Sequence, residues 1–327
     1  MRIYGFREDK MNILVSGSLA YDRIMDFPGK FSDHILPDKI HVLNVCFMID
    51  GLKENFGGTA GNIAYALSLL DENPTIITTA GRDFDSYKDW LVKSSITTEH
   101  IKIIDEELTA GAYITTDKSD NQITAFNPGA MKFSSGYDFE SVAHDNTVAI
   151  VSPGNLDDMY NFSNIYKQKK IDYIFDPGQS LPAWTEERLI EMIDGSKIFI
   201  CNDYELQLTQ DKTSMTIDDI LEKTEILVQT KSEHGSVVIL KEHGQTKNID
   251  IPAAKVDSVK DPTGAGDAYR AGLMKGFFLS DGDIVHAAKI GAVTAAYCVE
   301  VYGPQNFNFT PESFNKRFEE SFGEKAF

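Results

Sequence analysis

The 327-residue sequence lacks the features of several large protein classes. It has no run of 18 apolar residues and no apolar segment behind its charged N-terminus, which argues against a membrane span or a secretion signal. Its three cysteines, Cys46, Cys201 and Cys298, form no CxxC pair, which argues against a disulfide framework or a cysteine-rich metal site. We therefore expect a cytoplasmic protein, with residues 1–10 as a short extension before the first strand.

Cationic side chains are also scarce. The sequence has 31 Lys and Arg against 50 Asp and Glu, which gives a net charge of −19. Such a surface repels phosphate backbones and anionic lipid head groups, which argues against nucleic-acid and membrane partners. It also repels ATP at long range, so a nucleotide site has to be built locally. Neither GxxxxGKS/T nor GxGxxG occurs, so a P-loop or Rossmann nucleotide site has no support.

The sequence does contain short, apolar, β-branched runs that alternate with helical patterns. This alternation is typical of an α/β fold with a doubly wound, mostly parallel sheet and helices on both faces. The length is compatible with a single domain over residues 1–327. The expected strands lie in 12–17, 75–81, 147–154, 171–178, 197–202, 226–230 and 236–240, and helical patterns include 61–70, 84–94, 183–193 and two long segments in the C-terminal third.

Two stretches interrupt this alternation. Residues 19–56 and about 108–130 are rich in Phe, Ile, Thr and Asp and have no helical period. The second stretch contains AYITT, a polar DKSDN turn and QITAF, a pattern that predicts a β-hairpin. We expect the two stretches to form a small β-sheet lid over one edge of the main sheet.

Several expected strands end in polar or glycine-rich loops, at 152–155, 176–179 and 202–205. In an open parallel sheet the ligand crevice lies beyond the carboxyl ends of the strands. These loops are therefore expected to converge on one site, although each taken alone is also explained as an ordinary turn.

The most informative motif is DPTGAGDA at 261–268, which leads directly into a helix. Gly264 and Gly266 let backbone N–H groups approach an anion, and the helix adds its positive N-terminal end. This combination suits the charge of a transferring phosphoryl group, and Asp267 is placed to accept the proton of an attacking hydroxyl. A glycine-rich helix cap with an acid in its first turn explains the same residues without catalysis.

A second motif, GGTAGNIA at 57–64, also brings a helix N-terminus close to a ligand. Asn62 in its first turn can donate to and accept from a hydroxyl. A tight strand-to-helix turn with close packing is the alternative interpretation of these glycines.

These two motifs, in this order and about 200 residues apart, resemble those of the ribokinase-like (PfkB) family of carbohydrate and nucleoside kinases. The resemblance extends from residue 12 onward and includes Asn202 and Glu205, which match the family's Asn-x-x-Glu motif. It implies a magnesium-dependent enzyme that transfers the γ-phosphate of ATP to a hydroxyl.

The resemblance implies a role for each matching residue. Asp267 is the expected base, with Gly264, Ala265 and Gly266 as the anion hole. Glu205 is expected to organise Mg²⁺ through water, and Asp261 stands where some relatives bind K⁺. The expected acceptor-binding residues are Ser18, Asp22, Gly58, Asn62, Phe126 and Gln179, and the expected ATP-binding residues are Asn202, Thr230, Gly235 and Thr263. Alternative interpretations are a turn acid for Asp22, a helix cap for Asn202 and a surface acid for Glu205. The nucleotide loop departs from the family because Ser232 replaces a glycine.

The lid segments look most similar to bacterial ribokinase-like adenosine kinases. Phe126 matches a lid phenylalanine that stacks on the purine in those enzymes, and Gln179 offers an amide to a ring nitrogen. Ala112 occupies a position where a second aromatic residue is expected, and Phe126 is also explained as an ordinary lid residue. We therefore expect phosphorylation of adenosine at its 5′-hydroxyl. A ribose or fructose kinase is the alternative, a non-catalytic nucleoside sensor is a minor one, and dimerisation through the lid is a further hypothesis.

Overall fold

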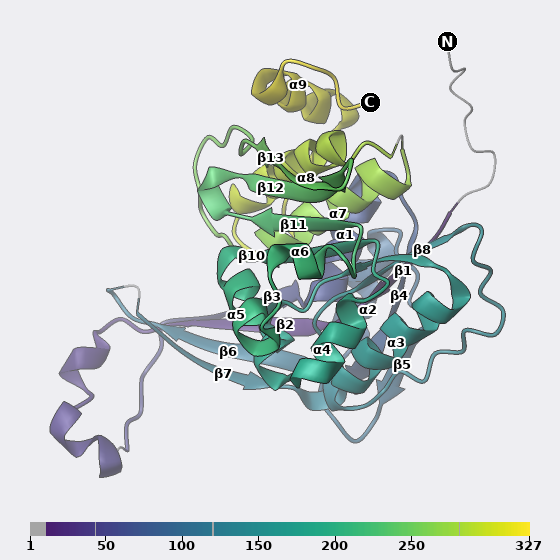
Figure 1. Cartoon of the computed structure of the whole chain (residues 1–327). Coiled ribbons are helices and arrows are strands. Elements are labelled where there is room, and N and C mark those ends of the chain that lie inside the picture. The colour runs from purple at the N-terminus through teal and green to yellow at the C-terminus, as the bar shows by residue number, and fades with distance from the viewer. Residues whose placement is uncertain (1–10, 43, 120, 281) are drawn as a thin grey trace.

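The computed structural model describes residues 11–42, 44–119, 121–280 and 282–327, so the extension expected at residues 1–10 lies outside the described residues. Within these residues a nine-stranded sheet has the order β13-β12-β11-β10-β9-β8-β1-β4-β5 (Figure 1). Neighbouring strands from β5 to β11 pair in parallel, and β12 and β13 pair antiparallel. The strands are β1 (Asn12–Ser16), β4 (Pro74–Gly81), β5 (Ile101–Ile104), β8 (Thr147–Val151), β9 (Asp172–Phe175), β10 (Ile198–Asn202), β11 (Ile226–Thr230), β12 (Ser236–Glu242) and β13 (Gln245–Ile251).

Both faces of this sheet are buried. Along β1, Ile13 and Val15 pack into one apolar core and Leu14 packs into the other, which explains why the strands are apolar without alternation. One face is covered by α1 (Thr59–Leu69), α2 (Asp85–Lys93), α7 (Ala265–Phe278), α8 (Ile284–Val299) and α9 (Pro311–Phe322), and the other by α3 (Leu156–Lys169), α4 (Glu186–Ile193), α5 (Asp203–Thr213) and α6 (Ile217–Ile220). The predicted α/β class, with helices on both faces, is confirmed.

A separate four-stranded sheet has the order β3-β2-β6-β7. Its strands are β2 (Ala20–Asp26), β3 (Gly51–Gly57), β6 (Ala110–Thr116) and β7 (Gln122–Asn127). They come from the two stretches predicted to form the lid, and β6 and β7 are the predicted hairpin. That the whole chain is one domain with the lid inserted stays a prediction.

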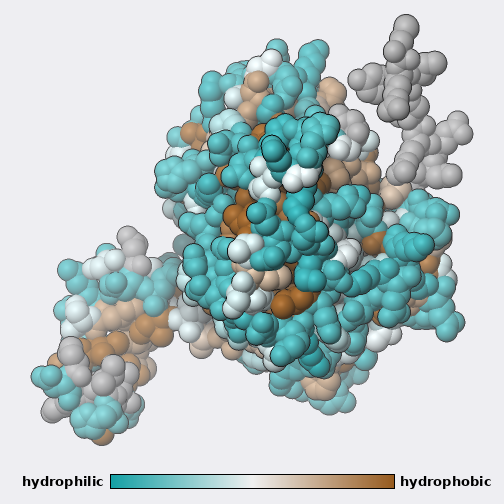
Figure 2. Space-filling view, viewed as in Figure 1, coloured by the Kyte–Doolittle hydropathy of each residue, from teal (hydrophilic) through white to brown (hydrophobic). Residues whose placement is uncertain are grey.

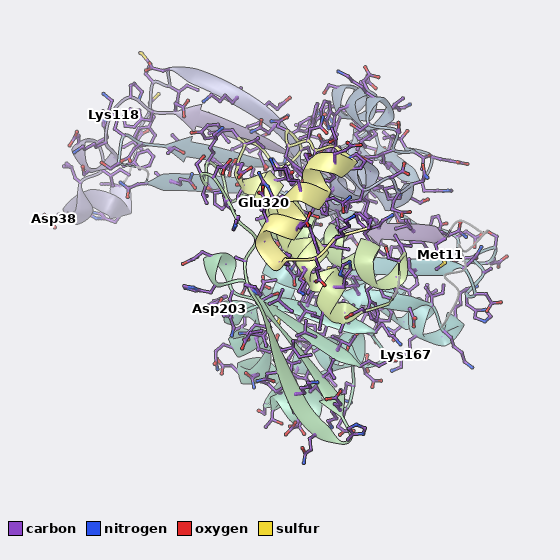
Figure 3. The ribbon with its side chains drawn as sticks, turned by 90° about the horizontal axis from the view of Figure 1, so that it is seen from above. Met11, Asp38, Lys118, Lys167, Asp203 and Glu320 are labelled. Carbon is purple, nitrogen blue, oxygen red and sulfur yellow. The ribbon has the colours of Figure 1, made fainter. Side chains whose placement is uncertain are left out.

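An arm, residues 27–42 and 44–50, projects from the small sheet between β2 and β3 (Figure 1). It contains the short helices η1 (Phe31–Asp33) and η2 (Pro37–Val42), although the sequence showed no helical period there. Viewed from above, Asp38 in this arm and Lys118 in the β6–β7 turn lie at the same end of the molecule (Figure 3).

The arm is held by aromatic contacts among Phe27, Phe31 and Phe47, with ring centroids 4.8–5.8 Å apart. Met48 is 84% exposed, and apolar surface is visible on the arm beside the hydrophilic body (Figure 2). Nothing in one chain shows what covers this surface, so dimerisation through the lid stays a prediction.

The carboxyl ends of the parallel strands meet along one edge of the large sheet, next to the small sheet. Backbone N–H groups after β8 and β9 donate across to the neighbouring strands, from Ser152 to Ser16 O and from Asp176 to Val151 O. The polar loops at 152–155, 176–179 and 202–205 therefore follow adjacent strands, as the topology of a parallel sheet requires. The first turn of α1 reaches this edge, because Thr59 Oγ1 donates to Pro153 O at 2.7 Å in the loop after β8. The first turn of α7 lies beside it, because Asn62 and Asp267 are hydrogen-bonded.

Candidate active site

The site is centred on the N-terminus of α7. Gly264 precedes the helix with φ = 79°, in the left-handed region that glycine adopts without strain. A Cβ on Gly264 would also overlap Pro304. Ala265 N–H donates to Pro262 O at 3.2 Å, while the first-turn N–H groups of Gly266 and Asp267 have no carbonyl of the same helix to donate to. These N–H groups and the helix dipole can hold an anion at this point.

Asp267 lies half-buried in the first turn of α7. Its Oδ2 accepts a hydrogen bond of 2.8 Å from Nδ2 of Asn62, which lies in the first turn of α1. Desolvation raises the pKa of Asp267, while Arg270 and the hydrogen bond from Asn62 act in the opposite direction. Asn62 and Asp267 are 205 positions apart, and the two glycine motifs therefore meet in this one contact between an amide and a carboxylate.

Asp22, on β2, faces the same region from the small sheet. Burial, together with the negative charges of Asp261 and Asp267, raises the pKa of Asp22 to about 6. The packing is close, because a Cβ on Gly57 would lie 2.7 Å from Asp22 Oδ2. An ionised Asp22 is a strong hydrogen-bond acceptor for hydroxyl groups.

Gly58 and Ser18 shape the entry into α1. Gly58 has φ = 86°, and a Cβ there would lie 2.5 Å from Ser18 O, so only glycine fits this position. Ser18 is 6% exposed, and its Oγ accepts a hydrogen bond of 3.1 Å from the backbone N–H of Thr59. Both residues have a structural role at this turn; contact with an acceptor stays a prediction.

Asp261 joins two loops. Its Oδ1 accepts from Thr263 N–H at 2.9 Å, and its Oδ2 accepts from Gly303 N–H at 3.0 Å. Asp261 therefore fixes the chain just before the α7 N-terminus against residues 301–306. A carboxylate oxygen can accept more than one bond, so this arrangement leaves the K⁺ hypothesis open to test. Thr263, predicted to contact ATP, is exposed.

Asn202 and Glu205 form a capping box at the start of α5. Asn202 Oδ1 accepts from Glu205 N–H at 2.7 Å, and Glu205 Oε2 accepts from Asn202 N–H at 2.8 Å. This is the helix-cap role that the sequence left open. It does not compete with a role at Mg²⁺, because that ion is commonly held by one or two carboxylates, water and substrate phosphates. Glu205 is partly exposed at the same edge as Asp176 and Arg270, whose pKa values its charge affects.

The expected nucleotide loop follows β11, which ends at Thr230. Gly235 has φ = 85°, and a Cβ there would lie 2.7 Å from Ala253 N, which explains the glycine. Ser232 has φ = 50°, the left-handed region that favours glycine. The position where this chain departs from the family is therefore one where a side chain costs about 1 kcal/mol of backbone strain.

Sequence reasoning missed a buried ion pair behind the α7 N-terminus. Arg270 Nη2 donates to Asp176 Oδ1 at 2.7 Å, and both side chains are nearly inaccessible. Burial raises the pKa of Asp176, and Arg270 counteracts this rise. A Cβ on Gly266 would lie 2.6 Å from Arg270 Nη1, so the guanidinium packs against the expected anion hole. The only signal in the sequence was the three-residue spacing from Asp267, which places Arg270 on a neighbouring helix position.

We predict that Arg270→Met lowers the free energy of unfolding by about 3–5 kcal/mol, because it leaves the Asp176 carboxylate buried without a partner. Urea unfolding measures this. Lys275→Met is the matched control on α7, since the Lys275–Glu72 pair is more exposed and its loss should cost no more than about 1 kcal/mol. Equal effects of the two substitutions would contradict the interpretation.

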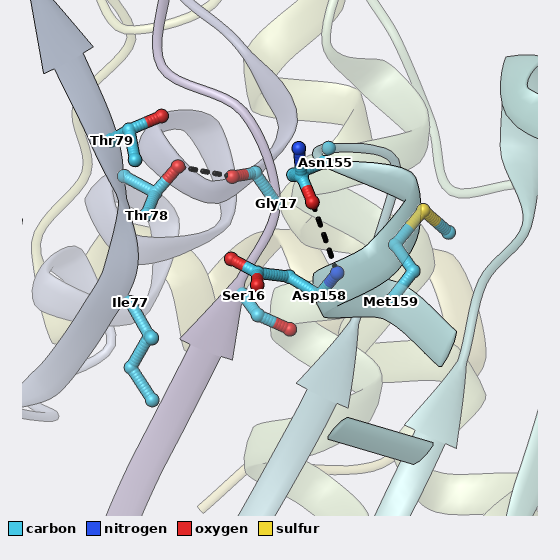
Figure 4. Close-up of a pocket in the computed structure, with 9 residues that line it drawn as sticks. Ser16, Gly17, Ile77, Thr78, Thr79, Asn155, Asp158 and Met159 are labelled. Carbon is cyan, nitrogen blue, oxygen red and sulfur yellow. Dashed lines mark hydrogen bonds between the residues drawn. The ribbon is translucent and has the colours of Figure 1, made fainter. Parts of the chain in front are cut away.

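A small cavity of about 10 Å³ lies at the carboxyl ends of β1 and β4 and the start of α3 (Figure 4). Thr78 Oγ1 donates to Gly17 O at 2.6 Å on one side, and Asp158 N–H donates to the Asn155 side chain at 3.0 Å on the other. This volume is on the scale of one water molecule and is too small for a nucleoside.

Two further observations concern the described part of the chain as a whole. No group of three or more His, Cys, Asp or Glu side chains within it is arranged to hold a metal ion. None of its helices has the length and apolar character needed to cross a membrane.

An open α/β sheet with a second, smaller sheet and a glycine-flanked helix N-terminus with an acid in its first turn is the arrangement expected of a ribokinase-type phosphotransferase. The chain matches the model of the pfkB family of carbohydrate kinases over residues 43–311, and it belongs to this family. The resemblance inferred from the two motifs is thereby confirmed.

Several similar proteins are nucleoside kinases, and others are sugar kinases, such as the deoxyribokinase of Salmonella typhi, which is 25% identical over 80% of this chain and 86% of that protein. The nucleoside kinase of Methanocaldococcus jannaschii is 34% identical over 265 residues, which cover 80% of this chain and 85% of that protein. The nucleoside kinase of Methanothermobacter thermautotrophicus is 28% identical over 97% of this chain and 98% of that protein. The structure of Burkholderia thailandensis nucleoside kinase in complex with inosine is 36% identical, covers 96% of this chain and 99% of that one, and has a TM-score of 0.82.

Proposed function

We propose that this chain transfers the γ-phosphate of ATP to the 5′-hydroxyl of a purine nucleoside, with adenosine as the acceptor. Asp267 takes the proton of the attacking hydroxyl. The N–H groups at the start of α7, in the turn formed by Gly264, Ala265 and Gly266, stabilise the charge on the transferring phosphoryl group, with Gly266 the member of this turn whose N–H has no carbonyl of the same helix to donate to. The contact between Asp267 and Asn62 supports this role, because it fixes the carboxylate beside the anion-binding helix end.

ATP is assigned to the loops after β10 and β11, with Asn202, Thr230 and Gly235 as contacts, and to Thr263 just before α7. Glu205 would hold Mg²⁺ through water, and the ion when bound neutralises phosphate charge. Activation by K⁺ at Asp261, a lid-mediated dimer and a cytoplasmic location are carried forward as predictions.

The register of the small sheet is the observation that best supports a nucleoside as the acceptor. Asp22 pairs with Ala112, and Ala112 pairs with Phe126, so the three residues form one row on one face of the sheet. Two strand spacings put Asp22 and Phe126 about 10 Å apart. Phe126 is 52% exposed, and the small Ala112 between the two leaves the row open. Ribose hydroxyls at Asp22 and a base stacked on Phe126 would span this row.

The same row of residues argues against a sugar kinase. A free sugar held by Asp22 would not reach Phe126, so the phenyl ring would have no function in a ribose or fructose kinase. A sensor would not need Asp267 beside an anion-binding helix end. Inosine is a second candidate acceptor, because the similar Burkholderia thailandensis enzyme was solved with inosine bound. Gln179 is exposed after β9, and its amide can pair with either purine since it both donates and accepts.

An ATP-consumption screen over adenosine, inosine, guanosine, cytidine, ribose and fructose tests the proposal. The expected result is a kcat/KM for a purine nucleoside that exceeds the value for either sugar by about 5- to 150-fold, since base stacking contributes about 1–3 kcal/mol. Turnover of ribose or fructose with equal efficiency would favour a sugar kinase, and turnover of no acceptor would favour a sensor.

We further predict that Ala112→Phe lowers kcat/KM for the nucleoside about 10- to 100-fold, because the ring fills the open row between Asp22 and Phe126. Ala125→Phe is the matched control, since Ala125 is the neighbour of Phe126 on β7 and faces the other side of the sheet. Steady-state kinetics with both variants measure the effect. Equal kinetics for the two variants would show that the purine base does not bind along this row.

A further inference from the structure

A chain of buried side chains leads from Asp267 into the interior. Asn62 is 6% exposed, and its Oδ1 accepts a hydrogen bond of 3.0 Å from Gln305 Nε2. Gln305 is 2% exposed and comes from the loop after α8, far from both glycine motifs in the sequence. The side chain that donates to Asp267 is therefore itself held by a second amide.

The direction of these hydrogen bonds is set by an indole. Trp90 Nε1 donates to Gln305 Oε1 at 2.9 Å, and an indole N–H is a donor only. The oxygen of Gln305 must therefore face Trp90, and its NH₂ group must face Asn62. That NH₂ also donates to Tyr87 Oη at 2.6 Å, while the Tyr87 hydroxyl donates to Gly57 O at 2.7 Å. Each group in this chain has one consistent role.

The orientation of the Asn62 amide follows. Its oxygen is turned toward Gln305, so its NH₂ group faces Asp267. A flipped Asn62 would place two oxygens against each other at Asp267 and two NH₂ groups against each other at Gln305, losing both bonds. The sequence suggested that Asn62 both donates to and accepts from an acceptor hydroxyl; in the structure its oxygen already accepts from Gln305.

The space for these hydrogen-bonded side chains depends on Gly61. A Cβ at that position would overlap the Tyr87 hydroxyl and lie 3.0 Å from Gln305 Nε2. Glycine in a helix interior destabilises the helix by about 1 kcal/mol relative to alanine. Packing rather than helix propensity therefore accounts for Gly61. The third glycine of the GGTAGN motif thus makes room for the side chains behind Asn62, not for a ligand.

We propose that Trp90, Gln305 and Tyr87 are positioning residues for phosphoryl transfer, which fix the Asn62 amide so that it donates to the Asp267 carboxylate. This inference rests on the proposed role of Asp267 as the base. It assigns a catalytic consequence to an indole that contacts neither Asn62 nor Asp267 in the hydrogen-bond chain.

The charged groups around Asp267 give the direction of the expected effect. Arg270, one turn along α7, and Asn62 on α1 act against the rise in the pKa of Asp267 that burial causes, and Asp22 and Asp261 add negative charge to the same region. If Asn62 no longer donates, the pKa of Asp267 rises further. The acidic limb of the kcat profile then moves to higher pH, since the base is protonated over a wider range.

Trp90→Phe tests the proposal most cleanly, because it removes the indole N–H and keeps an aromatic ring against Phe56 and Tyr65. We expect kcat to fall about tenfold, the acidic limb to move to higher pH, and ATP affinity to stay unchanged. Gln305→Glu should have a larger effect, because a carboxylate cannot donate to Asn62 and favours the flipped amide.

Tyr65→Phe is the matched control. It removes a hydrogen bond of 2.7 Å to Phe307 O in the same aromatic cluster but none in the chain to Asp267, so kcat and its pH profile should stay at wild-type values. Wild-type kcat and pH profile in Trp90→Phe would overturn the proposal, including in the case that Gln305→Glu does not fold. A wild-type enzyme that phosphorylates no acceptor would instead overturn the proposed function, so the two failures are distinguishable.

Discussion

Asp267→Asn is expected to lower kcat for phosphoryl transfer by about 10²–10⁴-fold while the fold and ATP binding are retained. The amide keeps the shape of the carboxylate but cannot accept the proton of the attacking hydroxyl. Folding should be unaffected or slightly improved, because burial already raises the pKa of Asp267 and so disfavours its charged form. Arg270 keeps its partner Asp176 in this variant.

Asp157→Asn is the matched control, since Asp157 is an exposed acid in the first turn of another helix, α3. Single-turnover kinetics and nucleotide titration on both variants separate chemistry from binding. Turnover by Asp267→Asn within a few-fold of the wild-type rate would contradict the role of Asp267 as the general base. A loss of ATP affinity as large as the loss of kcat would show that Asp267 acts in binding.

The motifs and the fold could be predicted because they are local or periodic. DPTGAGDA and GGTAGNIA each describe one turn and one helix start, and near-continuous apolar runs specify strands that are buried on both faces. The departure at Ser232 was also visible in the sequence, as a serine where the family has a glycine. In the structure Ser232 has the left-handed φ that explains the family's glycine. Edge strands were harder: β13 is mostly exposed, so it has no continuous apolar run.

What the sequence did not reveal depends on contacts between distant residues. The partner of Asn62 lies 205 positions away at Asp267, and its second partner lies 243 positions away at Gln305. A buried glutamine in a loop or a tryptophan on an amphipathic helix has no local pattern that marks it as part of a site. Only the packing of α1, α2 and the loop after α8 brings these polar groups together, and only the donor-only indole sets their order.

Asp22→Ala is expected to raise the KM for the acceptor by about a hundredfold or more and to leave ATP affinity nearly unchanged. In the proposed pose the carboxylate accepts two ribose hydroxyls, and each charge-assisted bond contributes roughly 1.5–3 kcal/mol. Asp26→Asn is the matched control, because Asp26 lies on the same face of β2 but near its distal end, paired with Lys53 at 3.4 Å. An unchanged acceptor KM in Asp22→Ala would place the ribose elsewhere.

The pH dependence gives Asp22 a second, independent test with opposite signs for binding and for stability. Since the pKa of Asp22 is raised to about 6, acceptor KM should rise as pH falls through about 6, where Asp22 loses the charge that holds the hydroxyls. For folding the sign reverses: a carboxyl whose pKa is higher in the folded state contributes stability below its unfolded value, and that contribution is lost as pH rises through about 6. Asp22→Asn should therefore be more stable than the wild type at pH 8 in urea unfolding and still bind the acceptor more weakly. If Asp22→Asn had the same stability as the wild type at pH 8, the ionised carboxylate of Asp22 would not be destabilised by its burial and by the negative charges of Asp261 and Asp267.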